Sequence, residues 1–122
     1  ARVEALNRRQ NPKSDEDIIQ IEDLILNKRK REVKRASKII LLQPQEYRLL
    51  EILMENSNEV LTRTMLLEKV WDLHFDPQTN IIDVHISRLR KKIDRGFNKY
   101  LLKTIRGAGY SIQGNVANNE NP

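Results

Sequence analysis

The sequence predicts an α+β domain in which a four-stranded antiparallel sheet precedes three helices and a C-terminal β-hairpin. Short β-rich runs alternate with polar breaks over residues 18–42. Apolar residues then recur at helical spacing up to residue 95, and two further short strands follow. The length of 122 residues suits one compact domain with terminal extensions and is too short for two ordinary domains.

The predicted sheet consists of four short strands joined by tight turns. Turn-forming residues separate the strands near Glu22-Asp23, at 27–30 and at Ala36-Ser37. The expected strands cover residues 18–21, 24–27, 31–35 and 38–41.

Three segments follow with the periodicity of helices. The first begins at Pro44, which is tolerated in the first turn of a helix, and ends near residues 56–58. Thr62 is a suitable N-cap for the second, whose apolar face holds Leu66, Leu67, Val70 and Trp71. The third helix runs from residue 79 or 80 to Arg95 and is stopped by Gly96. Residues 101–106 and 110–113 then predict a hairpin around the glycine-rich turn at 107–109.

The formal charge of +5 is unevenly distributed along the chain. Residues 28–38 hold seven basic groups and one acidic group, while residues 79–113 hold eight basic groups and two acidic groups. Both blocks therefore favour an anionic partner. No apolar run approaches the length of a membrane-spanning helix, and the absence of cysteine excludes disulfides, thiolate metal sites and cysteine nucleophiles.

The third helix predicts a surface for nucleic acid. A helical wheel places four apolar residues on a narrow core stripe, namely Ile82, Ile86, Leu89 and Ile93. The opposite face holds Val84, Arg88, Lys91 and Arg95, with Ile81 and Ser87 at its edges. No carboxylate shares this face, so its cations suit phosphates while its short and apolar groups suit base edges. We therefore expect this face to contact DNA.

Four other positions, on the third helix and in the hairpin, leave alternatives open or point outward. Arg90 lies within reach of Asp83 and Asp94 on the same helix, so a structural salt bridge competes with a phosphate contact. His85 borders the core stripe and suits either DNA contact or half-buried packing. In the hairpin, an inward Ile105 turns Thr104 and Arg106 outward, where they suit phosphate or minor-groove contact.

Three stretches resemble, in order, the motifs of the DNA-binding domain of OmpR/PhoB-type response regulators. They are LTRTMLLEKVW at 61–71, NIIDVHISRLRKKI at 80–93 and KTIRGAGY at 103–110. The resemblance covers residues 18–113 and implies a winged helix-turn-helix fold whose wing is the hairpin. Residues 1–9 resemble the last helix of a receiver domain that is otherwise missing, and the chain begins at Ala1, so we expect a fragment or processed form. Residues 10–17 predict a linker, and residues 114–122 predict a disordered tail.

The resemblance implies sequence-specific binding to double-stranded DNA as the effector domain of a two-component transcriptional regulator. The recognition helix over residues 80–95 would enter the major groove, and the wing over residues 101–113 would reach an adjacent groove or the backbone. The positions that match family contacts are Arg63, Trp71, Asn80, Ile81, Val84, His85, Ser87, Arg88, Lys91, Thr104 and Arg106. Two departures matter: Gln43 replaces the threonine that usually caps the first helix, which predicts a looser start, and Ser87 occupies a position that is often basic.

The resemblance also implies partners and a location. The loop that can meet RNA polymerase in activators matches Asp72, Leu73, His74, Phe75, Asp76, Pro77 and Gln78. Two copies would bind direct repeats head-to-tail, a sensor histidine kinase would act on the missing receiver domain, and the protein would be bacterial and cytoplasmic. No cofactor, metal or membrane partner is implied.

Other function classes are less favoured. An enzyme is not expected, because Asp83, His85 and Ser87 are i, i+2 neighbours on a helix and point about 200° apart. His74, Asp76 and His85 lack the spacing of a metal site. Residues 28–38 leave open an RNA-binding or membrane-surface module, but they hold no aromatic residue for stacking and suit a solvated hairpin. A winged-helix protein–protein adaptor is the third alternative, and the cations of the recognition helix speak against it.

Overall fold

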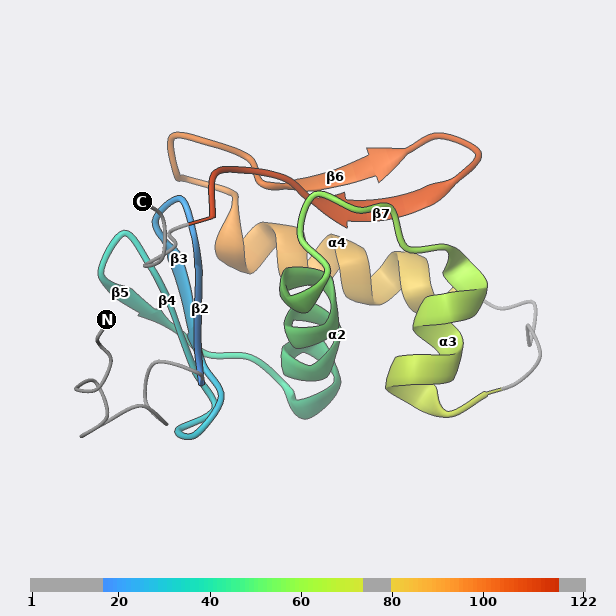
Figure 1. The fold of residues 1–122 in the computed structure, drawn as a ribbon, viewed down its shortest axis with the longest axis horizontal. Coiled ribbons are helices and arrows are strands. Elements are labelled where there is room, and N and C mark those ends of the chain that lie inside the picture. The colour runs from blue at the N-terminus through green and yellow to red at the C-terminus, as the bar shows by residue number, and fades with distance from the viewer. Residues whose placement is uncertain (1–16, 74–79, 117–122) are drawn as a thin grey trace, which may run out of the picture.

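The computed structural model describes residues 17–73 and 80–116. The strands are β2 (Ile18–Ile21), β3 (Leu24–Asn27), β4 (Glu32–Arg35), β5 (Lys38–Ile40), β6 (Leu102–Ile105) and β7 (Gly109–Ile112), and the helices are α2 (Pro44–Glu55), α3 (Arg63–Trp71) and α4 (Ile81–Ile93). Figure 1 shows α2 between the N-terminal sheet and α3, while the hairpin β6–β7 lies above α4 in this view. This arrangement confirms the predicted α+β winged helix-turn-helix.

The N-terminal sheet is antiparallel throughout, with the strand order β2-β3-β4-β5. Its turns include four non-glycine residues with positive φ, at Glu22, Arg31, Ala36 and Ser37. The strand predicted to begin at Arg31 begins at Glu32 instead, because Arg31 has a φ of 52° and belongs to the turn.

The three helices pack around one core. Thr62 caps α3 as predicted, since its hydroxyl oxygen accepts a hydrogen bond from the N–H of Met65 at 3.1 Å. The side chain of Gln43 makes no cap hydrogen bond at the start of α2, but the carboxylate of Glu46 accepts from the N–H of Gln43 at 2.9 Å and ties down this end of the helix. Lys92 of α4 pairs with the same carboxylate at 2.5 Å. Burial opposes ionisation of Glu46, but these hydrogen bonds outweigh it and hold the pKa of this carboxyl below its usual value.

The apolar stripe of α4 is the predicted one. Ile82, Ile86, Leu89 and Ile93 are all at most 2% exposed. The helix ends at Ile93 rather than at Arg95, and Arg95 lies in the following turn, where its N–H bonds to the carbonyl of Arg90 at 3.1 Å. Gly96 follows with a φ of 88°, which explains why the helix stops there.

A third backbone segment pairs with the hairpin β6–β7, and the sequence did not predict this pairing. Leu61, in the segment between α2 and α3, exchanges backbone hydrogen bonds with Tyr110 at 2.8 and 3.0 Å. At the adjacent Gly109 the backbone approaches so closely that a Cβ would lie 2.1 Å from the carbonyl oxygen of Leu61. Gly109 also has a φ of 153°, so glycine is required here by both space and conformation. The wing is thereby attached directly to the helix-turn-helix.

A buried arginine joins the sheet to the end of α4. Arg35 is 0% exposed, and it donates to Asp23 at 2.5 Å, to the carbonyl of Ile93 at 2.5 Å, to Asp94 at 3.0 Å and to the carbonyl of Lys99. The carboxylate of Asp94 also accepts the N–H groups of Leu101 and Leu102, each at 3.0 Å. One ion pair therefore fixes β4, the end of α4 and the start of β6 together.

The predicted disorder of residues 114–122 is wrong for residues 114–116, and residues 117–122 lie outside the described part. The N–H of Glu22 donates to the carbonyl of Asn115 at 2.9 Å, and the N–H of Asn115 donates back to the Glu22 carboxylate at 2.7 Å. Val116 bridges to Ile21 of β2. The predicted helix at residues 1–9 and the linker up to residue 16 also lie outside the described part. Within residues 17–73 and 80–116, no helix is long and apolar enough to cross a membrane.

Candidate nucleic-acid interface

The outward face of α4 forms a shallow groove. The groove has a volume of about 390 Å³ and is lined by Asn80, Asp83, Val84, Ser87, Arg88 and Lys91. Val84 is half-buried, whereas Ser87, Arg88 and Lys91 are exposed. The groove thus combines two cations with a short hydroxyl and an apolar group, as the helical wheel predicted. Asp83, expected on the flank, also reaches the groove.

Asp83 connects three elements of this surface. Its carboxylate accepts a hydrogen bond from the hydroxyl of Tyr110 in β7, and it lies 3.6 Å from the guanidinium of Arg63 at the start of α3. Burial, reinforced by this hydrogen bond to a carboxylate, raises the pKa of Tyr110 to about 12. The phenol therefore remains a hydrogen-bond donor at neutral pH. The ion pair with Asp83 also holds Arg63, a predicted phosphate contact, beside α4 and the wing.

His85 and Trp71 pack against each other beneath the edge of the groove. Their ring centroids lie 5.0 Å apart with an interplanar angle of 76°, an edge-to-face arrangement. Nδ1 of His85 lies 2.9 Å from the carbonyl oxygen of Ile81, so it donates to that carbonyl. Both side chains are half-buried, so the packing alternative for His85 is realised in this structure.

Arg90 pairs with neither of the two aspartates that the sequence places within its reach. Its guanidinium donates to the carbonyl of Leu102 at 3.2 Å and to the hydroxyl of Thr104, rather than to Asp83 or Asp94. The salt-bridge alternative for Arg90 is therefore not realised, because the side chain extends away from the helix axis towards β6. Thr104, a predicted wing contact, is thereby coupled to the recognition helix.

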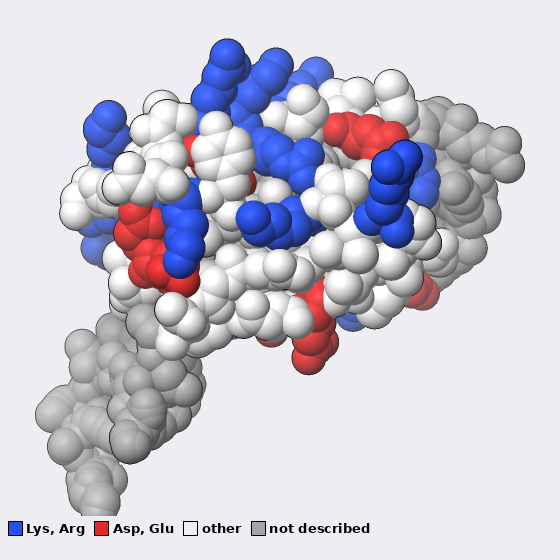
Figure 2. Space-filling view, turned by 90° about the horizontal axis from the view of Figure 1, so that it is seen from above, with Lys and Arg blue, Asp and Glu red and all other residues white. Residues whose placement is uncertain are grey.

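The cations of this region divide into paired and unpaired groups. Lys92 pairs with Glu46 at 2.5 Å, and Lys99 pairs with Glu22 at 3.3 Å. Five others are exposed and have no carboxylate partner within the described residues, namely Arg88, Lys91, Arg95, Lys103 and Arg106. Figure 2 shows Lys and Arg side chains at the upper edge and across the centre of this side of the molecule, with carboxylates in smaller separate groups around them.

The basic block at residues 28–38 is more engaged with the protein than a solvated hairpin would be. Lys28 pairs with Glu55 at 3.2 Å, and Arg29 lies 3.9 Å from Asp17. The guanidinium of Arg31 stacks over the ring of Tyr47 at 4.4 Å, and Arg35 is buried. The expectation of a solvated hairpin is therefore wrong for the buried Arg35, whereas Arg29 and Arg31 remain exposed.

The residue types of a catalytic triad do not converge. Asp83 faces Tyr110, His85 faces the carbonyl of Ile81 and Trp71, and Ser87 is exposed in the groove. Among the residues that the structure describes, no group of His, Asp or Glu side chains is arranged to hold a metal ion.

The loop predicted to meet RNA polymerase is described only at its start. Asp72 adopts the left-handed conformation that ends α3, with a φ of 57°. Leu73 donates its N–H to the carbonyl of Leu67 at 3.1 Å and packs against the core. Residues 74–79 lie outside the described part.

Comparison with known proteins gives a family for this arrangement. A family model described as "Transcriptional regulatory protein, C terminal" matches residues 37–112. The transcriptional regulatory protein CusR of Escherichia coli (strain K12) is 41% identical over 113 residues, which cover 93% of this chain and 50% of CusR. The phosphate regulon transcriptional regulatory protein PhoB of Rhizobium meliloti is 38% identical over 115 residues, with coverages of 93% and 50%. The chain thus spans about half the length of these relatives.

A solved structure extends this likeness to the fold. The DNA-binding domain of RstA from Klebsiella pneumoniae, in complex with the RstA box, matches with a TM-score of 0.71 at 28% sequence identity. The match covers 79% of this chain and 96% of the RstA domain.

Proposed function

Because the chain belongs to the OmpR/PhoB family of transcriptional response regulators, as their winged-helix DNA-binding domain, we propose that it binds specific sequences in double-stranded DNA. In this proposal α4 lies in the major groove, and the hairpin β6–β7 contacts an adjacent groove or the backbone. The domain acts as the effector of a longer regulator, since the relatives are about twice as long.

The observation that supports this function most strongly is the composition of the exposed face of α4. Arg88 and Lys91 extend from it without a carboxylate partner among the described residues, beside the smaller Val84 and Ser87. A helix of this width fits the major groove, where an arginine can bind a guanine edge with two hydrogen bonds. Because Ser87 is short and uncharged, it neither blocks Arg88 sterically nor competes with it for this contact.

The other predicted contacts have separate roles in the proposal. Asn80 and Ile81 begin the helix near the base edges, and Arg95 binds a phosphate beyond its end. Arg63 binds a phosphate from α3, and Trp71 donates its indole N–H to another. His85 supports the indole through its ring contact. Thr104 and Arg106 extend the contact through the wing.

The partners of the longer protein are proposals of the same kind. Two copies bind direct repeats head-to-tail, and a sensor histidine kinase acts on the receiver domain. The loop at residues 72–78 meets RNA polymerase at activated promoters. The regulator works in the bacterial cytoplasm, and the domain itself performs no catalysis.

Selection of bound duplexes from a random DNA pool tests the function directly. The 122-residue chain is expected to enrich one sequence, arranged as direct repeats, and to prefer it over RNA of the same sequence. If five to eight phosphates are neutralised per copy, log K should fall with log salt at a slope of about −5 to −7. A failure to enrich any sequence, or equal binding to RNA, would reject the proposal.

A further inference from the structure

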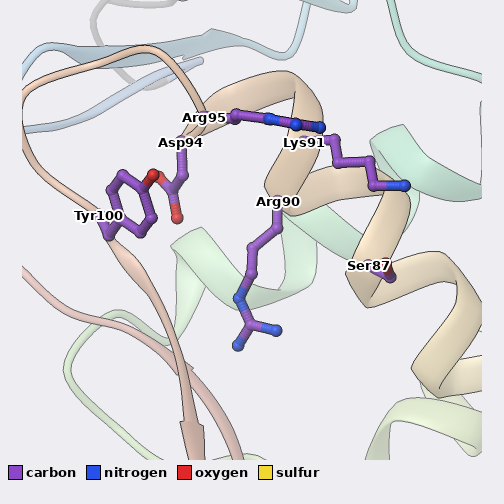
Figure 3. Close-up of a pocket in the computed structure, with 6 residues that line it drawn as sticks. All are labelled: Ser87, Arg90, Lys91, Asp94, Arg95 and Tyr100. Carbon is purple, nitrogen blue, oxygen red and sulfur yellow. The ribbon is translucent and has the colours of Figure 1, made fainter.

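A pocket continues the groove of α4 towards the base of the hairpin. It has a volume of about 270 Å³ and is lined by Ser87, Arg90, Lys91, Asp94, Arg95 and Tyr100. Ser87 and Lys91 also line the groove described above, so the two hollows adjoin each other along the helix. Figure 3 shows that Tyr100 enters from the segment that leads to β6, beside Asp94 and across the pocket from Ser87 and Lys91.

The charge of the pocket is positive despite the presence of Asp94. Lys91 and Arg95 are exposed, and neither has a carboxylate partner in the described part of the chain. The carboxylate of Asp94 is only 1% exposed and is bound from the protein side by Arg35, which also pairs with Asp23, and by two backbone N–H groups. An anionic ligand would therefore meet two available cations and a buried carboxylate that is already engaged by donors of the protein.

Tyr100 gives this pocket a feature that the rest of the face lacks. Its side chain is 54% exposed on the far wall, opposite Lys91 and Arg95. A phenolic hydroxyl is a hydrogen-bond donor suited to an anionic oxygen, and the ring restricts where that hydroxyl can lie. The pocket thus offers charge on one side and a directed donor on the other.

The position of the pocket relates it to the bound duplex. A helix in the major groove and a wing in the adjacent groove lie on either side of one sugar–phosphate backbone. The pocket lies between α4 and the segment that leads into the wing, which is where that backbone must cross.

We propose that this pocket holds one phosphodiester group of the DNA backbone, with Lys91 and Arg95 supplying charge and Tyr100 donating a hydrogen bond. The inference rests on the proposed DNA binding and adds a contact residue, Tyr100, outside the helix and the wing. A phosphate held here fixes how deeply α4 enters the groove, because it contacts both the helix and the base of the wing.

The test combines the Tyr100→Phe variant with DNA duplexes in which one backbone linkage carries no charge. The 122-residue chain and its variant are titrated with the selected duplex and with duplexes that carry one methylphosphonate linkage, moved along each strand. Loss of the hydroxyl should weaken binding to the unmodified duplex about fivefold to tenfold. At one linkage the methylphosphonate should weaken wild-type binding but weaken the variant clearly less, because the contact is already lost. Equal thermal unfolding midpoints for the two proteins would show that the variant is folded.

Each other outcome has a defined meaning. Unchanged affinity of Tyr100→Phe overturns the inference and leaves the proposed function intact. A loss of affinity that is the same on every modified duplex also overturns it, since the hydroxyl would then not contact a phosphate. If the wild-type chain binds no duplex, the proposed function itself has failed.

Discussion

Residues 28–38 and residues 79–113 each carry a net charge of +6, yet the structure places their cations in different surroundings. In the first block, four of seven cations contact an acidic or aromatic group of the described chain, and one of them is fully buried. In the second block, five of eight are exposed without a carboxylate partner in the described part. Equal net charge along the sequence therefore does not mean equal availability to an anionic partner.

The backbone geometry of each block explains the difference. Along β4, alternate side chains face the core, so Val33 and Arg35 both point inward and the arginine must find buried partners. Along α4, a narrow apolar stripe faces the core and leaves the opposite side free to carry cations. A strand in a small sheet thus buries half of its residues, whereas a surface helix keeps a wide polar face.

The largest expected effect tests whether the first block is structural. Arg35→Ala leaves Asp94 buried without its cation, so the free energy of unfolding should fall by about 3–5 kcal/mol. Urea denaturation measures this change. Lys34→Ala, one residue away on β4, is the matched control and should stay within about 0.5 kcal/mol. A loss for Arg35→Ala no larger than that of the control would contradict the structural role.

The next effect tests whether the second block contacts DNA. Arg88→Ala should weaken binding to the selected duplex by about 1–3 kcal/mol if the side chain binds a base edge. Arg29→Ala should leave affinity unchanged, because its position is on the sheet and its nearest carboxylate is Asp17. Fluorescence anisotropy titrations of both variants provide the comparison. If Arg29→Ala weakens binding more than Arg88→Ala does, the sheet rather than α4 carries the interface.

A smaller effect separates phosphate contacts from bystanders through salt. Lys91→Gln should reduce the magnitude of the slope of log K against log salt by about one, because one fewer phosphate is neutralised. Lys34→Gln removes a cation from the other block and should leave the slope unchanged. Equal slopes for both variants and the wild type would remove Lys91 from the interface.

The smallest effect concerns how the second block is held together. Tyr110→Phe removes the hydrogen bond to Asp83 and should lower the free energy of unfolding by up to about 1 kcal/mol at neutral pH. The pKa of Tyr110 is raised from 10.0 to about 12, so its contribution is full below pH 10 and is lost as the pH rises through 12. Unfolding measured at pH 9 and 11 should show a larger loss in the wild type than in Tyr110→Phe, in which Tyr47, whose pKa burial also raises, still titrates.

Asp83→Asn provides a control for that assignment. It keeps an acceptor but removes the negative charge, so the pKa of Tyr110 should move down towards 10. Absorbance titration of the tyrosinates measures the shift. An unchanged titration would mean that burial alone raises this pKa.

The elements of the fold could be predicted because their signals are local. The turn at Glu22-Asp23, the cap at Thr62 and the stop at Gly96 each act within a few residues. The core stripe of α4 follows from helical periodicity alone, and all four of its residues are buried. The predicted boundaries consequently agree with the structure to within a few residues.

The contacts between elements could not be predicted in the same way. Arg35 and Asp94 are 59 residues apart, and Tyr110 and Asp83 are 27 apart. The helical wheel indicated two possible aspartate partners for Arg90 on its own helix. The side chain bonds instead to β6, and a helical wheel gives no information on where β6 lies. Tyr100 carried no signal either, because a lone tyrosine in a loop gains meaning only when the pocket around it is known.

The buried Arg35 has a consequence for the order of events during synthesis. Three of its four partners belong to residues 93–99, so β2–β5 leave the ribosome well before this guanidinium can be satisfied. The edge of strand β2 is likewise covered only after Val116 has been synthesised. Strands β2 and β4 are therefore completed by segments that follow α4, and a nascent chain that stalls before residue 94 exposes an incomplete domain to proteases and chaperones. The same closure makes folding dependent on long-range contacts and slows it relative to a purely helical bundle of this size.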